Sequence, residues 1–234
     1  MMAPVLPLVL VPGLLCSARL YTPQIAALWP FGPVTVADHR RDAEVAAIAA
    51  RILADAPPRF ALAGLSLGGY IAFAMLRQAP ERIAKLALLD TSARPDTVEQ
   101  SVRRENFIAM AEAGKLTEVV NTLMQVYVHR NRHNDEGLKR IVQDMAVDTG
   151  VEAFVRQQKA IMSRMDSRPL LAAIRCPTLV LVGDGDELTP PALSKEICTG
   201  ISGARLVVVP DCGHLSTIEK PDAVNAALAE WLST

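Results

Sequence analysis

The sequence has few aromatic residues, little net charge and no long uninterrupted apolar run. Only 4% of its 234 residues are Phe, Trp or Tyr, and the formal net charge is −1. A near-neutral balance provides no basic face for nucleic acid or an anionic membrane surface, so neither is expected as a partner. No stretch reaches the ~18 apolar residues that a membrane span requires. We therefore expect a soluble, cytoplasmic protein that is a monomer or a homodimer.

Motifs for metals, cofactors and secretion are also missing. The four cysteines, Cys16, Cys176, Cys198 and Cys212, match no zinc or redox spacing, and buried free thiols are expected. Neither a Walker loop nor a dinucleotide-binding glycine pattern is present, so no cofactor and no metal are expected. The apolar N-terminus lacks the basic start and the cleavage site of a signal peptide, and a buried strand explains it better.

Short apolar runs alternate with longer segments of helical periodicity. Half of the residues are hydrophobic, and near-continuous Val, Leu and Ala runs are typical of parallel strands covered on both faces. The alternation predicts a doubly wound α/β fold. Predicted strands are residues 5–11, 33–37, 60–65, 85–90, 178–183 and 205–210, and predicted helices are residues 42–55, 66–78, 191–200 and 221–232.

The alternation breaks in the middle of the chain. Between Arg94 and Pro177 the pattern is helical throughout, with predicted helices at residues 98–113, 115–129, 136–147, 150–165 and 169–174. A structureless loop of this length would be unusual in a compact domain. We therefore expect an α/β core formed by residues 1–94 and 177–234, and a helical lid insertion formed by residues 95–176.

The strongest chemical signal is the pentapeptide Gly64-Leu65-Ser66-Leu67-Gly68. It reads G-x-S-x-G, follows an apolar strand and precedes a helical pattern, which is the context of a nucleophile elbow. The serine then sits on a sharp turn, above a helix N-terminus that favours developing negative charge. Ser66 is therefore the predicted nucleophile.

A serine hydroxyl needs a base to accept its proton. His214 follows the last predicted strand and precedes the last helix, which makes it the candidate. The other histidines compete poorly. His129 and His133 fall in the helical stretch among arginines and are expected to be solvated, and His39 is expected in a polar loop.

The base in turn needs an acid that fixes its tautomer. Asp186 follows the fifth predicted strand, and the order Ser66, Asp186, His214 is the order of the triad in α/β-hydrolases. Asp184 and Glu187 are close rivals in sequence. Asp90 is a further alternative, because it ends a neighbouring strand and could reach the same histidine.

The developing oxyanion needs hydrogen-bond donors. The backbone N–H of Leu67, directly after the nucleophile, is one candidate, and the N–H of Leu14 in the turn after the first strand is the other. Substrate contacts are expected from that turn and from the insertion. The residues expected there are Leu15, Cys16, Arg19, Met124 and Tyr127.

Four motifs together resemble the α/β-hydrolase superfamily, in particular its esterase-, lactonase- and carbon–carbon-hydrolase-like members. They are residues 10–13 (LVPG), 64–69 (GLSLGG), 183–190 (GDGDELTP) and 213–214 (GH). The resemblance implies a mostly parallel sheet, here of about six strands, with helices on both faces. Two departures stand out. Pro12 replaces the family's frequent histidine, and residues 38–42 lack the glycines of a D-x-R-G-x-G loop.

These features predict a serine hydrolase that cleaves a small to medium apolar ester or lactone through an acyl-enzyme on Ser66. Two alternatives stay open. The same triad could serve a lyase reaction or cleave a carbon–carbon bond, or the fold could act as a ligand receptor.

Overall fold

A computed structural model describes residues 5–234 of the chain. Its centre is a sheet of six strands in the order β2-β1-β3-β4-β5-β6, and every neighbouring pair is parallel. The strands are β1 (Leu8–Val11), β2 (Val34–Val36), β3 (Phe60–Leu65), β4 (Ile83–Leu89), β5 (Thr178–Gly183) and β6 (Arg205–Val209). The predicted parallel α/β sheet of about six strands is therefore confirmed, with all six strands close to their predicted positions.

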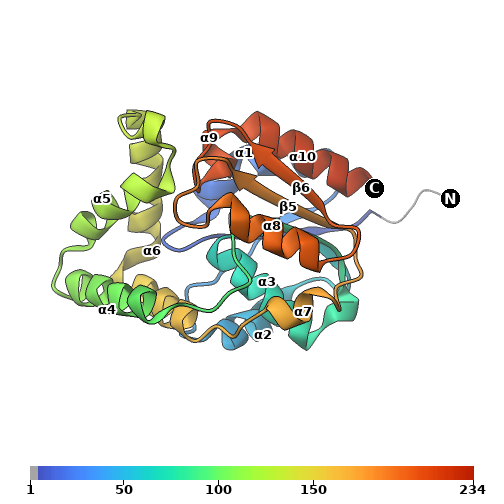
Figure 1. Ribbon diagram of the computed structural model, residues 1–234, viewed down its shortest axis with the longest axis horizontal. Helices are drawn as coiled ribbons and strands as arrows, with labels where there is room; N and C mark the ends of the chain where they lie inside the picture. The colour runs from blue at the N-terminus through green and yellow to red at the C-terminus, as the bar shows by residue number, and fades with distance from the viewer. Residues whose placement is uncertain (1–4) are drawn as a thin grey trace.

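The strands are apolar because helices cover both faces of the sheet. Helices α1 (Thr22–Leu28) and α10 (Pro221–Ser233) pack together on one face. The other face carries α2 (Val45–Asp55), α3 (Leu67–Gln78) and α8 (Pro191–Gly200), as Figure 1 shows. Every residue of β1, β3 and β5 is buried. A strand covered on both faces needs no polar alternation, which explains the continuous apolar runs.

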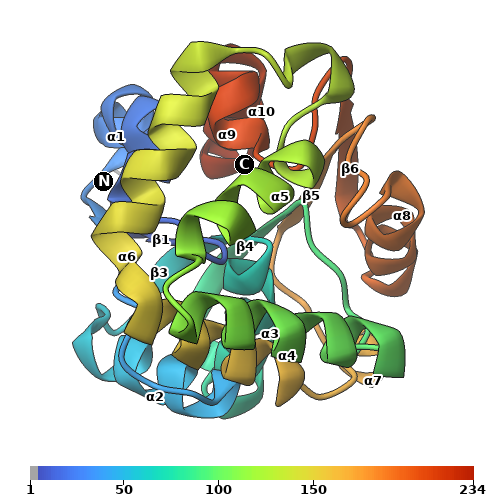
Figure 2. The same cartoon turned by 90° about the vertical axis from the view of Figure 1, so that its left-hand side faces the viewer.

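The chain between β4 and β5 is helical throughout. It contains α4 (Val98–Glu112), α5 (Leu116–Tyr127), α6 (Glu136–Met162) and α7 (Arg168–Leu171). Two predicted helices join into α6, which bends at Gly150, where the backbone has φ 75°. Glycine reaches this region without steric cost. Helices α4, α5 and α6 lie beside the ends of the strands in both views (Figures 1 and 2). That this segment acts as a lid, and the predicted domain boundaries, stay predictions.

Short elements complete the chain. A short helix, α9 (Ser216–Glu219), follows β6, and 3₁₀ turns cover Ala18–Tyr21, Trp29–Phe31, Pro80–Arg82 and Arg130–Arg132. Neither α1 nor α9 was expected from the sequence pattern, because each is under eight residues long and shows too little periodicity. None of the helices within residues 5–234 combines the length and apolarity needed to cross a bilayer.

All four cysteines are free thiols. Cys16 and Cys212 are buried as expected, whereas Cys176, in the loop before β5, and Cys198, in α8, are half-buried.

Candidate active site

Ser66 stands at the turn between β3 and α3. Its backbone has φ 55° and ψ −113°, an unusual combination for a residue with a side chain. The surrounding structure holds it there, because the Ser66 N–H donates to the Leu89 carbonyl (3.0 Å) and the Thr91 hydroxyl donates to the Ser66 carbonyl (2.8 Å). This strained turn is the geometry of a nucleophile elbow.

The glycines of the motif are required by close backbone contacts. A Cβ on Gly64 would collide with the carbonyl of Gly68, and a Cβ on Gly68 would collide with the carbonyl of Val11 in β1. Backbone atoms cannot move aside without disturbing the sheet. The G-x-S-x-G spacing therefore lets helix α3 approach β1 and β3 directly beneath Ser66.

His214 and Asp186 form a buried pair at the ends of β6 and β5. Nδ1 of His214 lies 2.8 Å from Oδ2 of Asp186, and the histidine is 1% exposed. A carboxylate can only accept, so Nδ1 carries the proton and donates it to this bond. Nε2 then keeps its lone pair, and it has no hydrogen-bond partner within residues 5–234. The tautomer is the one that a general base requires.

Four donors hold the Asp186 carboxylate. Oδ1 accepts the N–H groups of Leu188 (2.9 Å) and Thr189 (2.8 Å), and Oδ2 accepts the Thr189 hydroxyl (2.7 Å) as well as His214. Burial opposes ionisation of Asp186, but the charge of His214 and these hydrogen bonds outweigh it and lower the pKa of Asp186. Thr189 was not singled out from the sequence, although it lies three residues after the predicted acid.

The contact with Asp186 also shifts the pKa of His214. Burial disfavours the imidazolium, but the negative charge of Asp186 and its hydrogen bond outweigh burial and raise the pKa of His214 above its ordinary value. The pair is therefore arranged to stabilise the positive charge that appears when the histidine accepts a proton.

Asp90 and Asp184, two of the other candidate acids, accept hydrogen bonds from groups other than His214. Asp90 accepts the Gly183 N–H (3.0 Å) and the Ser216 hydroxyl, and Asp184 accepts the Cys212 N–H (3.3 Å). Burial and the charge of Asp186 raise the pKa of Asp90 well above its ordinary value, which favours a neutral group. Neither side chain, nor that of Glu187, makes a hydrogen bond to His214 within the described chain.

Two backbone N–H groups near Ser66 are free to donate. Leu67 is the first residue of α3, where helix geometry leaves its N–H without an intrahelical acceptor. The N–H of Leu14, in the turn after β1, makes no hydrogen bond within residues 5–234. By contrast, the N–H of Leu15 donates to Oε1 of Gln157 in α6 (3.0 Å), so it is not free to donate to an oxyanion.

Tyr127 connects the turn, the base and the helical segment. Its hydroxyl donates to the Leu14 carbonyl (3.0 Å), and its ring stacks on that of His214, with centroids 5.8 Å apart and an interplanar angle of 25°. The main chain adds a further link, because the Leu215 N–H donates to the Tyr127 carbonyl (2.9 Å). Helix α5 therefore packs directly over the candidate base.

A cavity of about 460 Å³ opens above Ser66. Its wall includes Ser66, Leu14 and Tyr127, together with apolar side chains of α4, α5, α6 and α8: Phe107, Leu123, Val126, Ile161 and Leu193. Of the five side chains expected to contact substrate, only Tyr127 lines this cavity.

The other four expected contacts lie elsewhere. Met124 and Leu15 are both buried in the hydrophobic core, and neither lines this cavity. Cys16 and Arg19 line a separate hollow of about 380 Å³. Arg19 is held there by an ion pair with Asp148 (2.8 Å). Leu15 has a left-handed backbone, with φ 56°, and this conformation could not be predicted from the sequence.

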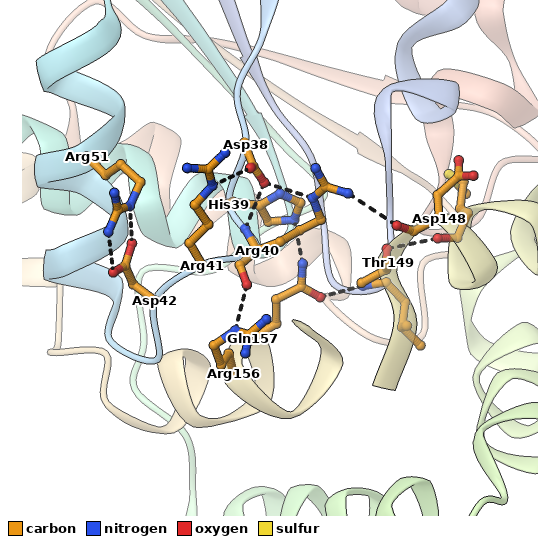
Figure 3. Close-up of polar contacts among 12 residues, drawn as sticks. Asp38, His39, Arg40, Arg41, Asp42, Arg51, Asp148, Thr149, Arg156 and Gln157 are labelled. Atoms are coloured by element: carbon orange, nitrogen blue, oxygen red, sulfur yellow. Dashed lines mark hydrogen bonds and ion pairs between the residues drawn. The ribbon is translucent and has the colours of Figure 1, made fainter. Parts of the chain in front are cut away.

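His39 lies in the polar loop after β2, as expected, but its side chain is buried. Its Nε2 lies 2.9 Å from the Gly13 carbonyl and 3.0 Å from the amide nitrogen of Gln157, and the tautomer decides which contact is the hydrogen bond. Figure 3 shows His39 against Gln157, beside the ion pairs that Asp38 forms with Arg40 (2.8 Å) and Arg41 (3.0 Å). These ion pairs hold the loop that lacks the family glycines.

His129 is also buried rather than solvated. The backbone N–H of His129 donates to the Glu219 carboxylate (2.8 Å). The same carboxylate accepts the backbone N–H of Gly213 (3.0 Å), next to His214. Gly185 and Gly213 pack against it so closely that a Cβ on either would collide with His129 or its neighbour Val128. His133 is half-buried.

We expect acid to destabilise the protein through His39. Burial lowers the pKa of His39 from 6.5 to about 4. The unfolded chain therefore binds a proton at His39 between these values while the folded chain does not, so stability falls as the pH drops through this window. Between pH 7 and pH 5 this group alone removes about 2 kcal/mol of unfolding free energy.

Urea denaturation at pH 7 and pH 5 measures this loss. The variant His39→Gln keeps an amide donor for the Gly13 carbonyl but does not titrate, so its stability should fall by about 2 kcal/mol less than that of the parent protein. Equal losses for both proteins would show that His39 does not govern this pH dependence.

No three His, Cys, Asp or Glu side chains converge as a metal site in the part of the chain that the structure describes.

Comparison with known proteins finds one family whose model matches most of the chain. A model of the alpha/beta hydrolase family matches residues 8–227. A pimeloyl-[acyl-carrier protein] methyl ester esterase of Neisseria meningitidis is 25% identical over 225 residues, which cover 90% of this chain and 86% of that protein.

Two solved structures resemble the whole chain. A thermophilic esterase from Thermogutta terrifontis, with malate bound, has a TM-score of 0.88 and 28% identity, covering 97% of this chain and 89% of that one. The enol-lactonase of Burkholderia xenovorans LB400 has a TM-score of 0.89 and 25% identity, covering 99% and 93% of the two chains.

Proposed function

Because this chain belongs to the α/β-hydrolase family and is a hydrolase of that fold, we propose that it cleaves a carboxylic ester or lactone through an acyl-enzyme on Ser66. The observation that carries the proposal is the buried His214–Asp186 pair (2.8 Å), which leaves Nε2 of His214 with a free lone pair. An unpaired acceptor buried in a protein costs free energy. A serine proton or a leaving alcohol would supply its missing partner.

The mechanism follows from these positions. Ser66 Oγ attacks the substrate carbonyl while Nε2 of His214 accepts the hydroxyl proton. Asp186 stabilises the imidazolium, and the N–H groups of Leu14 and Leu67 donate to the oxyanion. The tetrahedral adduct then collapses, His214 protonates the departing alkoxide, and the acyl group stays on Ser66. A water molecule, deprotonated by His214, repeats the sequence and releases the acid.

The cavity supports a substrate of small to medium size. A volume of about 460 Å³ lies in the lower part of the range of pockets for small molecules. Apolar side chains from α4, α5 and α6 line much of it, which suits an acyl chain. An esterase and an enol-lactonase among the similar structures support this choice of reaction over lyase chemistry or a receptor role.

Trapping the acyl-enzyme tests the proposal. The protein is mixed with 4-nitrophenyl butanoate, quenched in acid, and analysed by mass spectrometry after proteolysis. We expect a butanoyl group on the peptide that contains Ser66, and no such adduct in His214→Ala. Turnover of esters without any adduct on Ser66 in either rapid or slow quenches would contradict the acyl-enzyme route.

A further inference from the structure

Arginine is concentrated in the wall of the cavity above Ser66. Four arginines line it, and the only carboxylate among the lining residues is that of Glu187. Behind the wall, Glu196 pairs with one arginine and Asp96 with two. Among these wall groups the arginines outnumber the carboxylates, and two of the arginines share one carboxylate. The lining arginines are Arg94, Arg103, Arg104 and Arg164.

The excess charge is located where Arg104 and Arg164 share Asp96. Asp96 lies 2.6 Å from Nε of Arg104 and 2.7 Å from Nη1 of Arg164, and its side chain is only 3% exposed. The arginines are themselves 15% and 6% exposed. A single carboxylate cannot neutralise two guanidinium groups, and a buried charge without a partner is costly. An incoming anion would balance this group.

Gln158 supplies an independent sign of a ligand. It is fully buried, it lines the same cavity, and its Oε1 accepts a hydrogen bond from Nη1 of Arg104 (2.9 Å). A guanidinium only donates, so this bond fixes which end of the amide is oxygen. The amide nitrogen Nε2 then has no hydrogen-bond partner within residues 5–234. A buried donor left unpaired marks a place where an acceptor is missing.

Arg103 adds a positive charge at the cavity that has no ion-pair partner among the described residues. It lies next to Arg104 on α4, is exposed, and makes no ion pair or hydrogen bond with any described residue. Arg94, by contrast, is held by Glu196 through two hydrogen bonds of 2.9 Å. Arg104 itself has five N–H groups and uses three of them, on Asp96 and Gln158.

We propose that this wall binds a carboxylate of the substrate, remote from the carbonyl that Ser66 attacks. Nε2 of Gln158, the free N–H groups of Arg104, and Arg103 donate to its oxygens. A carboxylate has two acceptor oxygens and a negative charge, which match these free donors, so the substrate class is a monoester or lactone that carries a free carboxylate. This inference rests on the proposed ester or lactone hydrolysis and specifies its substrate.

Monomethyl and dimethyl adipate provide a matched pair of probes. They differ by one methyl group and one negative charge, and they present the same methyl ester. We expect the parent enzyme to hydrolyse the monoester with a kcat/KM roughly 10- to 100-fold above that of the diester, because a charge-assisted hydrogen bond contributes that factor. Equal values, or a preference for the diester, would overturn the carboxylate site.

Two variants locate the site. Gln158→Met keeps the length of the side chain but removes the amide donor, together with the oxygen that accepts from Nη1 of Arg104. Arg103→Gln removes the positive charge that has no ion-pair partner. Each should lower kcat/KM for the monoester by roughly tenfold or more and leave that for the diester within about twofold. Arg140→Gln, an exposed α6 arginine outside the cavity lining, is the control and should change neither value. A preference that survives in both cavity variants would place the carboxylate elsewhere.

Binding measurements separate this proposal from the hydrolysis on which it rests. In Ser66→Ala, calorimetric titration with monomethyl adipate needs no catalysis. We expect binding that weakens by roughly tenfold or more when Gln158→Met is added. Hydrolysis of both probes without any charge preference would leave the proposed function standing and reject the site. Charge-dependent binding without hydrolysis would support the site and reject the proposed function. Absence of monoester binding in Ser66→Ala would overturn the site.

Discussion

Replacing Ser66 with alanine should abolish ester hydrolysis. The substitution removes the only atom proposed to form a bond with the substrate, and we expect kcat to fall on the order of 10⁶-fold, as for other triad nucleophiles. Ser66 is 7% exposed at the strained turn, and alanine fits this space without changing the backbone contacts of Gly64 and Gly68. Initial rates on 4-nitrophenyl butanoate measure the loss, and circular dichroism checks that the variant is folded.

Ser92→Ala is the matched control for this substitution. Ser92 lines the same cavity, but its hydroxyl already accepts the backbone N–H of Arg94 (3.0 Å). Its loss should cost no more than about tenfold, the order of one hydrogen bond. Activity of Ser66→Ala within tenfold of the parent enzyme would show that another group attacks the substrate.

Asp186→Asn should give the second largest effect, a fall in kcat on the order of 10⁴-fold. An asparagine can offer its NH₂ to Nδ1 of His214, which would favour the tautomer with the proton on Nε2. The base would then have no lone pair for the Ser66 proton. The substitution also removes the negative charge that stabilises the imidazolium.

The pH profile tests this role separately from the rate. Only the neutral histidine acts as a base, so kcat/KM rises with pH through the pKa of His214. Burial alone would lower this pKa, but the charge of Asp186 raises it above 6.5. We therefore expect the acid limb of the parent enzyme above pH 6.5, and a shift of that limb to lower pH in Asp186→Asn.

Two asparagine variants distinguish Asp186 from its rivals. Asp184→Asn keeps an amide oxygen that can accept the Cys212 N–H (3.3 Å), and Asp90→Asn keeps one that can accept the Gly183 N–H. Both should keep activity within about tenfold of the parent enzyme and leave the acid limb in place. A larger loss in Asp90→Asn than in Asp186→Asn would assign the acid to β4 instead of β5.

The parts of the site that are local in sequence could be predicted from it. Ser66 lies in a pentapeptide whose glycines are needed because Gly64 and Gly68 touch neighbouring backbone. The glycine spacing in the sequence therefore predicts the tight turn that carries Ser66. Asp186 and His214 follow apolar strands that were recognisable from composition alone. A parallel sheet brings the carboxyl ends of its strands to one edge, which is why residues so far apart in sequence could be expected together.

The parts that depend on packing between distant segments could not be predicted. Gln157 reaches His39 across 118 residues, and Gln158 reaches Arg104 across 54. Both contacts depend on how α6 continues through the bend at Gly150, and a helical pattern does not show which face of the helix meets which loop. Burial of His39 and His129 was missed for the same reason, because their neighbours come from other parts of the chain.

The most direct test of the account is labelling with a broad fluorophosphonate probe, followed by peptide mapping. The probe requires an activated serine but no knowledge of the substrate. We predict stoichiometric modification of Ser66, lost in His214→Ala and retained in Asp184→Asn. A folded protein that is not labelled at Ser66, or is labelled equally well without His214, would contradict the claim that these residues form a nucleophile and its base.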